Sequence, residues 1–254
     1  MAASYTVTGI DGVPLVEPGD DLAFLLISAV DAQAVRPVDG DIFVIAQKVV
    51  SKAEGRLVAL SSIEPSPEAQ RLAAETNKEP RHVEVILRES REVVRSRRDV
   101  IIVEHRLGYV LANAGVDRSN VAGAVDDETV LLLPEDPDAS ADALKDRFDA
   151  HWKCSVGIVI ADSVGRAWRL GSVGIAIGAA GVAALRDHRG DRDLFGRAME
   201  SAIACPVDAI ASAATLAMGE ADEGVPAAHV RGIPCGLPTP ARTINRSKSE
   251  DMFR

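Results

Sequence analysis

Residues 156–181 read VGIVIADSVGRAWRLGSVGIAIGAAG, and they begin with the clearest buried strand of the chain, residues 156–161. A continuous run of Val, Ile and Ala is typical of a strand covered on both faces. Asp162 and Ser163 follow it directly. The Gly- and Ala-rich run 173–185 comes next, and it is shorter than the roughly 18 apolar residues that a membrane helix needs. This region therefore predicts the centre of a globular sheet.

Outward from this centre, the pattern predicts both helices and strands. Helical spacing with breakers or caps indicates helices over residues 20–34, 68–75, 138–152 and 206–221. Short apolar runs indicate strands over residues 42–46, 83–87, 100–103, 109–112 and 228–231. The elements show no regular βαβ alternation, so the fold class is α+β, with mixed sheets and packed helices.

Composition excludes several classes of protein. The 254 residues carry a formal net charge of −10, which argues against sequence-independent binding to nucleic acid, and 47% are hydrophobic, which fits a sizeable core. The three cysteines are far apart without CxxC spacing, and no secretion signal or membrane span is evident. We expect a soluble, cytoplasmic protein that binds neither membrane nor nucleic acid.

Common catalytic motifs are absent from the sequence: there is no GxxxxGK[ST], GxGxxG after a strand, HExxH or GxSxG. Polar residues instead cluster where predicted strands end. Asp162 and Ser163 offer the oxygen ligands that Mg²⁺ or Mn²⁺ prefers. Asp117 and Asn120 lie on the loop NAGVDRSN, residues 113–120. Each pair is equally typical of a turn, so spacing alone leaves both alternatives open.

Three further segments carry charge. QKVVSK, residues 47–52, has two lysines that could neutralise phosphates, and MGEADEGV, residues 218–225, is acidic. Both could equally be solvated surface. Six arginines between residues 166 and 197 alternate with aspartates, which fits either an anion site or a salt-bridged surface.

Taken together, the segments resemble the coenzyme F420-0:L-glutamate ligase (F420 gamma-glutamyl ligase) family. The blocks that carry the resemblance occur in one order: DIFVIAQKVVSKAEGR, HRLGYVLANAGVDRSNV, LLPEDPDASA, IADSVGRAWRLGSVGIAIGAAG, RDHRGDRDLFGR and MGEADEGVP. The resemblance extends from Gly12 to the C-terminal EDMFR. It implies one ligase domain over residues 1–254, with two intertwined subdomains as an option, a non-P-loop gamma-glutamyl ligase-like fold and no C-terminal nitroreductase-like domain.

The resemblance also implies an activity. The family joins L-glutamate to coenzyme F420-0 at the expense of GTP, through an acyl phosphate, giving F420-1 and in some cases longer γ-linked polyglutamate tails. It uses two divalent ions, Mn²⁺ or Mg²⁺, together with K⁺, and it acts as a homodimer. F420-0, L-glutamate and GTP are thus the expected small-molecule partners.

Site residues follow from the positions that match the family's motifs. The implied metal ligands are Asp117, Asp162, Ser163 and Glu220. The implied GTP-binding positions are Val13, Pro14, Leu15, Val16, Gln47, Lys52, Asn120, Met218, Gly219, Glu220, Ala221, Asp222, Glu223, Gly224 and Val225. No catalytic acid or base is identified, nor any residue that binds F420-0.

Departures from the family pattern keep two alternatives open. The usual DTFGRPWR reads DSVGRAWR here, and Gln47 replaces a smaller residue. These changes leave room for a GTP-dependent glutamate ligase that acts on a different anionic metabolite. A non-catalytic nucleotide- or metal-binding module is the alternative from another class, and the retained carboxylates argue against it.

Overall fold

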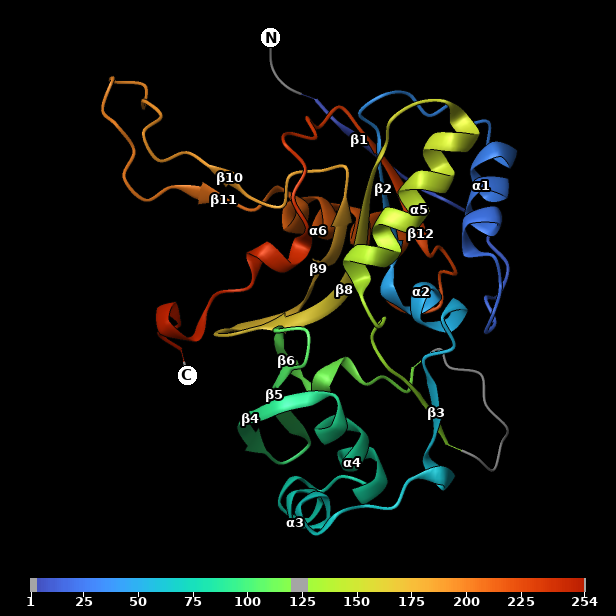
Figure 1. The fold of residues 1–254 in the computed structure, drawn as a ribbon, viewed down its shortest axis with the longest axis vertical. Coiled ribbons are helices and arrows are strands. Elements are labelled where there is room, and N and C mark those ends of the chain that lie inside the picture. The colour runs from blue at the N-terminus through green and yellow to red at the C-terminus, as the bar shows by residue number, and fades with distance from the viewer. Residues whose placement is uncertain (1–3, 120–127, 254) are drawn as a thin grey trace.

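The computed structural model describes residues 4–119 and 128–253, and its main feature is a mixed five-stranded sheet (Figure 1). The strand order is β1 (Thr6–Gly9), β12 (Ala227–Arg231), β2 (Ile42–Ala46), β8 (Gly157–Arg166) and β9 (Arg169–Ala180). β2 and β8 are parallel, and every other neighbouring pair is antiparallel. This mixture confirms the predicted α+β class.

Helices cover both faces of this sheet. α1 (Leu22–Ala32) and α5 (Pro137–Trp152) pack with Ile158 and Ile160 of β8 in one hydrophobic cluster. α6 (Pro206–Met218) packs with Val159 and Ala161 in another, on the opposite face. Successive residues of a strand point to opposite faces, so both faces of β8 need apolar side chains. This explains the unbroken apolar run after Val156.

The Gly- and Ala-rich part of the sequence forms β9, which lies between two helices. A Cβ at Gly174 would come within 2.6 Å of the carbonyl oxygen of Ala211 in α6, and one at Gly178 within 2.3 Å of the carbonyl oxygen of Pro137 in α5. Helix backbone therefore approaches β9 so closely that only glycine fits at these two positions.

A second part of the molecule has its own hydrophobic cluster. It contains α3 (Pro67–Thr76), α4 (Pro80–Arg88), a sheet of β4 (Ser90–Arg97), β5 (Val100–His105) and β6 (Val110–Ala112), and the pair β3 (Leu57–Ala59) and β7 (Thr129–Leu131). This cluster lies below the main sheet in Figure 1. Whether these parts are the intertwined subdomains of the sequence-based expectation stays a prediction.

The prediction of a strand over residues 83–87 is wrong, because these residues belong to α4. Glu79 caps this helix by accepting a hydrogen bond from the backbone N–H of His82, and Pro80 occupies its first turn. Val83 and Ile86 are fully buried at helical spacing. A short apolar run does not distinguish helix from strand, so the start signals at Glu79 and Pro80 should have taken precedence.

The other predicted helices and strands are confirmed with small shifts at their ends, except that the strand predicted over residues 156–161 continues to Arg166, so Asp162 and Ser163 lie within β8 rather than after it. Asp21 caps α1 by accepting a hydrogen bond from the backbone N–H of Phe24 at 3.0 Å. α6 ends at Met218 rather than at residue 221, because Gly219 follows it with a positive φ of 74°. None of the helices in residues 4–119 and 128–253 is both long and apolar enough to cross a membrane.

Two segments extend from this body in Figure 1. A hairpin arm, residues 186–204, includes β10 (Arg186–Asp187) and β11 (Ile203–Ala204) and projects away from the rest of the chain. The C-terminal segment, from residue 241 onward, runs past β4 and β5 to the hairpin between β8 and β9, where the ring of Phe253 meets that of Trp168.

Candidate functional site

The ends of several strands meet at one edge of the main sheet. Ala46, the last residue of β2, pairs with Ala161 in the parallel β8, so Gln47 and Asp162 follow side by side. The backbone N–H of Ala46 donates to the carbonyl of Pro226 at 2.8 Å, and that of Ile10 donates to the carbonyl of Ala227 at 2.8 Å. The loop before β12 and the segment after β1 are therefore at the same edge.

This edge gathers most of the residues that the sequence singled out. Residues 13–16 leave the sheet after β1, Gln47 begins α2 (Gln47–Ala53), Asp162 and Ser163 lie in β8, and residues 219–225 connect α6 to β12. In open sheets of parallel strands, ligands bind beyond the carboxyl ends of the strands, and β2 and β8 are the parallel pair of this sheet. Asn120 lies outside the described residues.

Asp117 reaches the edge from the second part of the molecule. Its backbone forms a bridge with Leu131, and its carboxylate forms an ion pair with Lys48 Nζ at 2.7 Å. Ser119 donates to the same carboxylate from its backbone N–H at 2.7 Å and from its hydroxyl at 3.0 Å. Burial opposes ionisation of Asp117, but these donors, Lys48 first, hold its pKa below the ordinary value.

Asp162 is in the opposite electrostatic situation. Burial raises the pKa of this carboxyl to about 7, and the negative charge of Asp117 adds to the effect. The backbone N–H of Ser163 donates to Oδ1 at 2.9 Å, and the side chain of Gln47 also donates. No cation within the described residues forms an ion pair with Asp162. It is thus a half-buried carboxyl, near a second carboxylate, whose charge is only partly compensated.

Glu220 joins the loop after α6 to the hairpin of β8 and β9. One carboxylate oxygen accepts from the hydroxyl of Ser163 at 3.2 Å, and the other accepts from the hydroxyl of Ser172 at 2.6 Å. Glu223 folds back within the same loop and accepts from the backbone N–H of Ala221 at 2.8 Å. These bonds order the acidic loop beside Ser163.

The donor set fits a hard divalent cation. Asp117, Asp162, Ser163 and Glu220 offer only oxygen atoms, which are the ligands that Mg²⁺ and Mn²⁺ prefer. Within the described residues, no group of three or more His, Cys, Asp or Glu side chains has the geometry of a metal centre. The partly compensated charge of Asp162 is the observation that favours a cation here.

The predicted GTP positions divide into buried and exposed groups. Gln47 is buried, and its side-chain oxygen accepts from the hydroxyl of Ser51 at 2.9 Å. The same side chain donates a hydrogen bond to Asp162. Lys52 is half-buried, and burial together with the charge of Lys48 lowers its pKa. Leu15, by contrast, is 89% exposed, and Asp222, Glu223 and Gly224 are exposed as well.

Three side chains at the edge are missing from the predicted site. Lys48, Ser119 and Ser172 contact Asp117 or Glu220 directly. A signal for Lys48 was present: it lies four residues before Lys52, so both fall on one face of α2. The contact with Asp117 joins residues 69 positions apart. That pairing depends on tertiary structure.

The six arginines of the sequence do not form one cluster. Arg166 and Arg169 close the hairpin between β8 and β9, whereas Arg186, Arg189, Arg192 and Arg197 lie on the arm. Arg189 pairs with Asp187 at 2.5 Å, and the guanidinium of Arg192 donates to the carbonyl of Gly196 at 2.6 Å. On the arm, these partners fit the salt-bridged surface better than an anion site.

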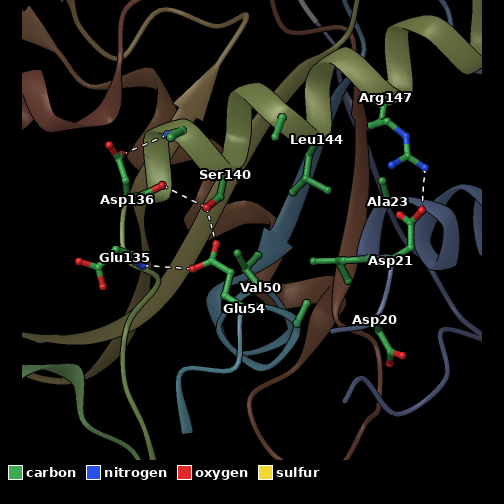
Figure 2. Close-up of a pocket in the computed structure, with 14 residues that line it drawn as sticks. Asp20, Asp21, Ala23, Val50, Glu54, Glu135, Asp136, Ser140, Leu144 and Arg147 are labelled. Atoms are coloured by element: carbon green, nitrogen blue, oxygen red, sulfur yellow. Dashed lines mark hydrogen bonds and ion pairs between the residues drawn. The ribbon is translucent and has the colours of Figure 1, made fainter. Parts of the chain in front are cut away.

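A cavity of about 650 Å³ lies elsewhere, between α1, α2 and α5 (Figure 2). Its rim includes Asp20, Glu54 and Glu135, and the carboxylate of Asp21 pairs with Arg147 at 2.9 Å. None of the predicted site residues that the structure describes lines this cavity. A rim rich in carboxylates repels anionic ligands, so this cavity is unsuited to phosphate-bearing substrates.

Comparison with known proteins gives a consistent result. A family model described as F420-0:Gamma-glutamyl ligase matches residues 12–232. Coenzyme F420:L-glutamate ligase of Methanopyrus kandleri is 50% identical over 253 residues, covering 96% of this chain and 97% of that protein. The enzymes of that name from Methanothermobacter thermautotrophicus and Archaeoglobus fulgidus are 46% and 41% identical, covering 98% and 96% of this chain and 98% and 94% of those proteins.

Proposed function

Because the chain belongs to the F420-0:gamma-glutamyl ligase family, we propose that it is a GTP-dependent ligase that joins L-glutamate to coenzyme F420-0. The observation that supports this proposal is that Asp117, Asp162, Ser163 and Glu220 lie along one edge of the main sheet, with Lys48 paired to Asp117 and Ser163 bonded to Glu220. An amide ligase must activate a carboxylate by phosphorylation, and an oxygen-rich, partly cationic site suits phosphoryl transfer.

The proposed reaction has two steps. A carboxylate oxygen of F420-0 attacks the γ-phosphorus of GTP, the bond between the β- and γ-phosphates breaks, and GDP leaves with that bond's electrons. The glutamate amine then attacks the acyl carbon, the bond from that carbon to the phosphate oxygen breaks, and inorganic phosphate leaves. The amine loses a proton as the amide forms. Further cycles would extend a γ-linked tail.

The chain's own residues would bind and orient these reactants. Two divalent ions, Mn²⁺ or Mg²⁺, held by Asp117, Asp162, Ser163 and Glu220, would supply positive charge against the phosphate oxygens. Lys48 and Lys52, on one face of α2, add cationic charge at the same edge. Gln47 and the backbone of Ser163 orient the carboxyl of Asp162. GTP would lie along residues 13–16 and 218–225, and K⁺ is part of the same proposal.

Mass spectrometry tests the function directly. F420-0 incubated with GTP, Mn²⁺, L-glutamate and the protein should gain one or more glutamyl units, and no product should form without GTP. Phosphate release from GTP with another carboxylate, but no glutamylated F420-0, would instead indicate a different anionic acceptor. GTP binding without turnover on any acceptor would contradict the ligase and indicate a binding module.

We propose also that the protein is a homodimer, with the arm as a contact surface. At the end of the arm, Leu194 is 99% exposed and Phe195 is 87% exposed. Adjacent exposed apolar side chains of this size mark interaction sites. The arm also projects from the body (Figure 1), so a second copy could contact both of its sides.

Replacing both Leu194 and Phe195 by serine should convert the dimer to a monomer. Light scattering after size exclusion should give twice the chain mass of 26.8 kDa for the unchanged protein and a single chain mass for the variant. Leu216→Ser is the control, because Leu216 is 90% exposed but lies on α6. A variant that keeps the dimer mass would rule out the arm as the contact.

A further inference from the structure

A second cavity, of about 500 Å³, lies between the C-terminal segment and the sheet of β4, β5 and β6. We call it the basic groove. Its walls carry the cationic side chains of Arg91, Arg242, Arg246 and Lys248, and Glu104 is the one carboxylate among the described residues that line it. Glu92 and Asp138 also pair with two of these cations, so one positive charge is left over here, in a chain whose formal net charge is −10. A concave surface of this kind concentrates anions.

The arrangement holds the cations in place without neutralising all of them. Glu104 is buried, and its two oxygens face Arg91 at 3.2 Å and Lys248 at 3.4 Å. Lys248 also pairs with Glu92 at 2.8 Å, and Arg242 pairs with Asp138 at 3.3 Å. Among the described residues, none contributes a carboxylate to Arg246, whose side chain is exposed. Arg246 is therefore the cation most available to a ligand.

Backbone contacts fix the shape of the groove. The side-chain amide of Asn245 donates to the carbonyl of Leu107 at 3.1 Å, which ties the C-terminal segment to the turn between β5 and β6. Gly108 in this turn has a φ of +90°, and a Cβ there would come within 3.1 Å of the Asn245 amide nitrogen. The two walls thus meet at a position where glycine is needed.

The same turn connects the groove to the candidate site. Tyr109, the next residue, donates its hydroxyl to the carbonyl of Ile177 in β9 at 2.5 Å. Ile177 is two residues from Ile175, which pairs with Asp162 across β8 and β9. Two residues of a strand span about 7 Å. The turn that forms one wall of the groove therefore contacts β9 close to the proposed reaction centre.

We propose that the basic groove binds the α-carboxylates of a γ-linked glutamyl tail. This inference rests on the proposed function, because each glutamate joined through its γ-carboxyl leaves one free α-carboxylate. The carboxylate that reacts next is at the end of the tail, so the earlier α-carboxylates must trail away from the reaction centre. Arginine suits them because its guanidinium can form two parallel hydrogen bonds to one carboxylate.

Binding of a synthetic γ-linked triglutamate, measured by calorimetry at low salt, tests this inference without any turnover. We expect Arg246→Ala to weaken binding about tenfold, the effect of losing one charge-assisted contact. Arg98→Ala is the matched control: Arg98 is an exposed arginine between β4 and β5, outside the groove, and its replacement should leave affinity unchanged. Added salt should weaken binding to the unchanged protein.

The outcomes are distinguishable. Equal affinity in Arg246→Ala and the unchanged protein, or no binding to either, would overturn the inference. Displacement of the peptide by inorganic phosphate at equal concentration would show that the basic groove binds oxyanions in general. This result would overturn the assignment of the groove to a γ-linked glutamyl tail. The protein could also bind triglutamate through Arg246 and yet form no glutamylated F420-0. That result would support the basic groove as a glutamyl-binding site and would contradict the proposed function.

Discussion

Asp162→Asn should abolish formation of glutamylated F420-0 while leaving the protein folded. The substitution keeps the shape of the side chain and removes the negative charge that the proposed metal ions require. In the protein alone that charge is unfavourable, because burial and the charge of Asp117 raise the pKa of Asp162 to about 7. We therefore expect the variant to unfold at the same denaturant concentration as the unchanged protein or at a higher one.

Loss of product together with unchanged stability would separate a functional role of Asp162 from a structural one. A carboxylate that maintains the fold would lower stability when replaced, whereas one kept for ligand binding would not. Asp146→Asn is the control, because Asp146 is an exposed aspartate on α5, a helix that carries none of the predicted site residues. Mass spectrometry of the product and a urea unfolding curve are the two measurements. Full turnover by Asp162→Asn would remove Asp162 from the proposed metal site.

Local patterns in the sequence predicted the strands that build the site. The run from residue 156 to 161 is apolar on both faces because α5 and α6 cover it, and burial of this kind is visible in composition. The change from apolar residues to Asp162 and Ser163 marks the point where β8 stops being covered on both faces, but it is not the end of the strand, because β8 continues to Arg166 in its hairpin with β9. The polar residues could therefore be named from the sequence, whereas their position within a strand could not.

The meeting of these strand ends could not be predicted in the same way. Asp117 comes from the second part of the molecule, and its partner Lys48 lies on α2. No spacing rule joins them, because the contact follows from how two separate hydrophobic clusters pack. Motif resemblance supplied Asp117, Asp162 and Glu220 together, but only the structure identifies Lys48 as the partner of Asp117 and Ser172 as a partner of Glu220. The strand predicted over residues 83–87 is wrong for a simpler reason, since a short apolar run fits both helix and strand and the local start signals at Glu79 and Pro80 favour the helix.

Gly178→Ala should strongly destabilise the protein, although it adds a single carbon. The new Cβ would lie 2.3 Å from the carbonyl oxygen of Pro137 and 2.6 Å from its carbonyl carbon, and both are backbone atoms of α5. Backbone in the first turn of a long helix cannot move aside as a flexible side chain would. Overpacking of this kind costs about 3 kcal/mol of unfolding free energy, or more where the backbone must shift.

Gly165→Ala provides the matched comparison within the same hairpin. Nothing lies within 4 Å of a Cβ at Gly165, and its backbone conformation is one that alanine adopts without strain. That variant should be neutral or more stable by up to about 1 kcal/mol, because alanine lowers the entropy of the unfolded chain. The two urea midpoints should therefore move in opposite directions or differ widely. Equal stability of both variants would mean that α5 does not press against β9, and the Gly- and Ala-rich sequence of β9 would then need another explanation.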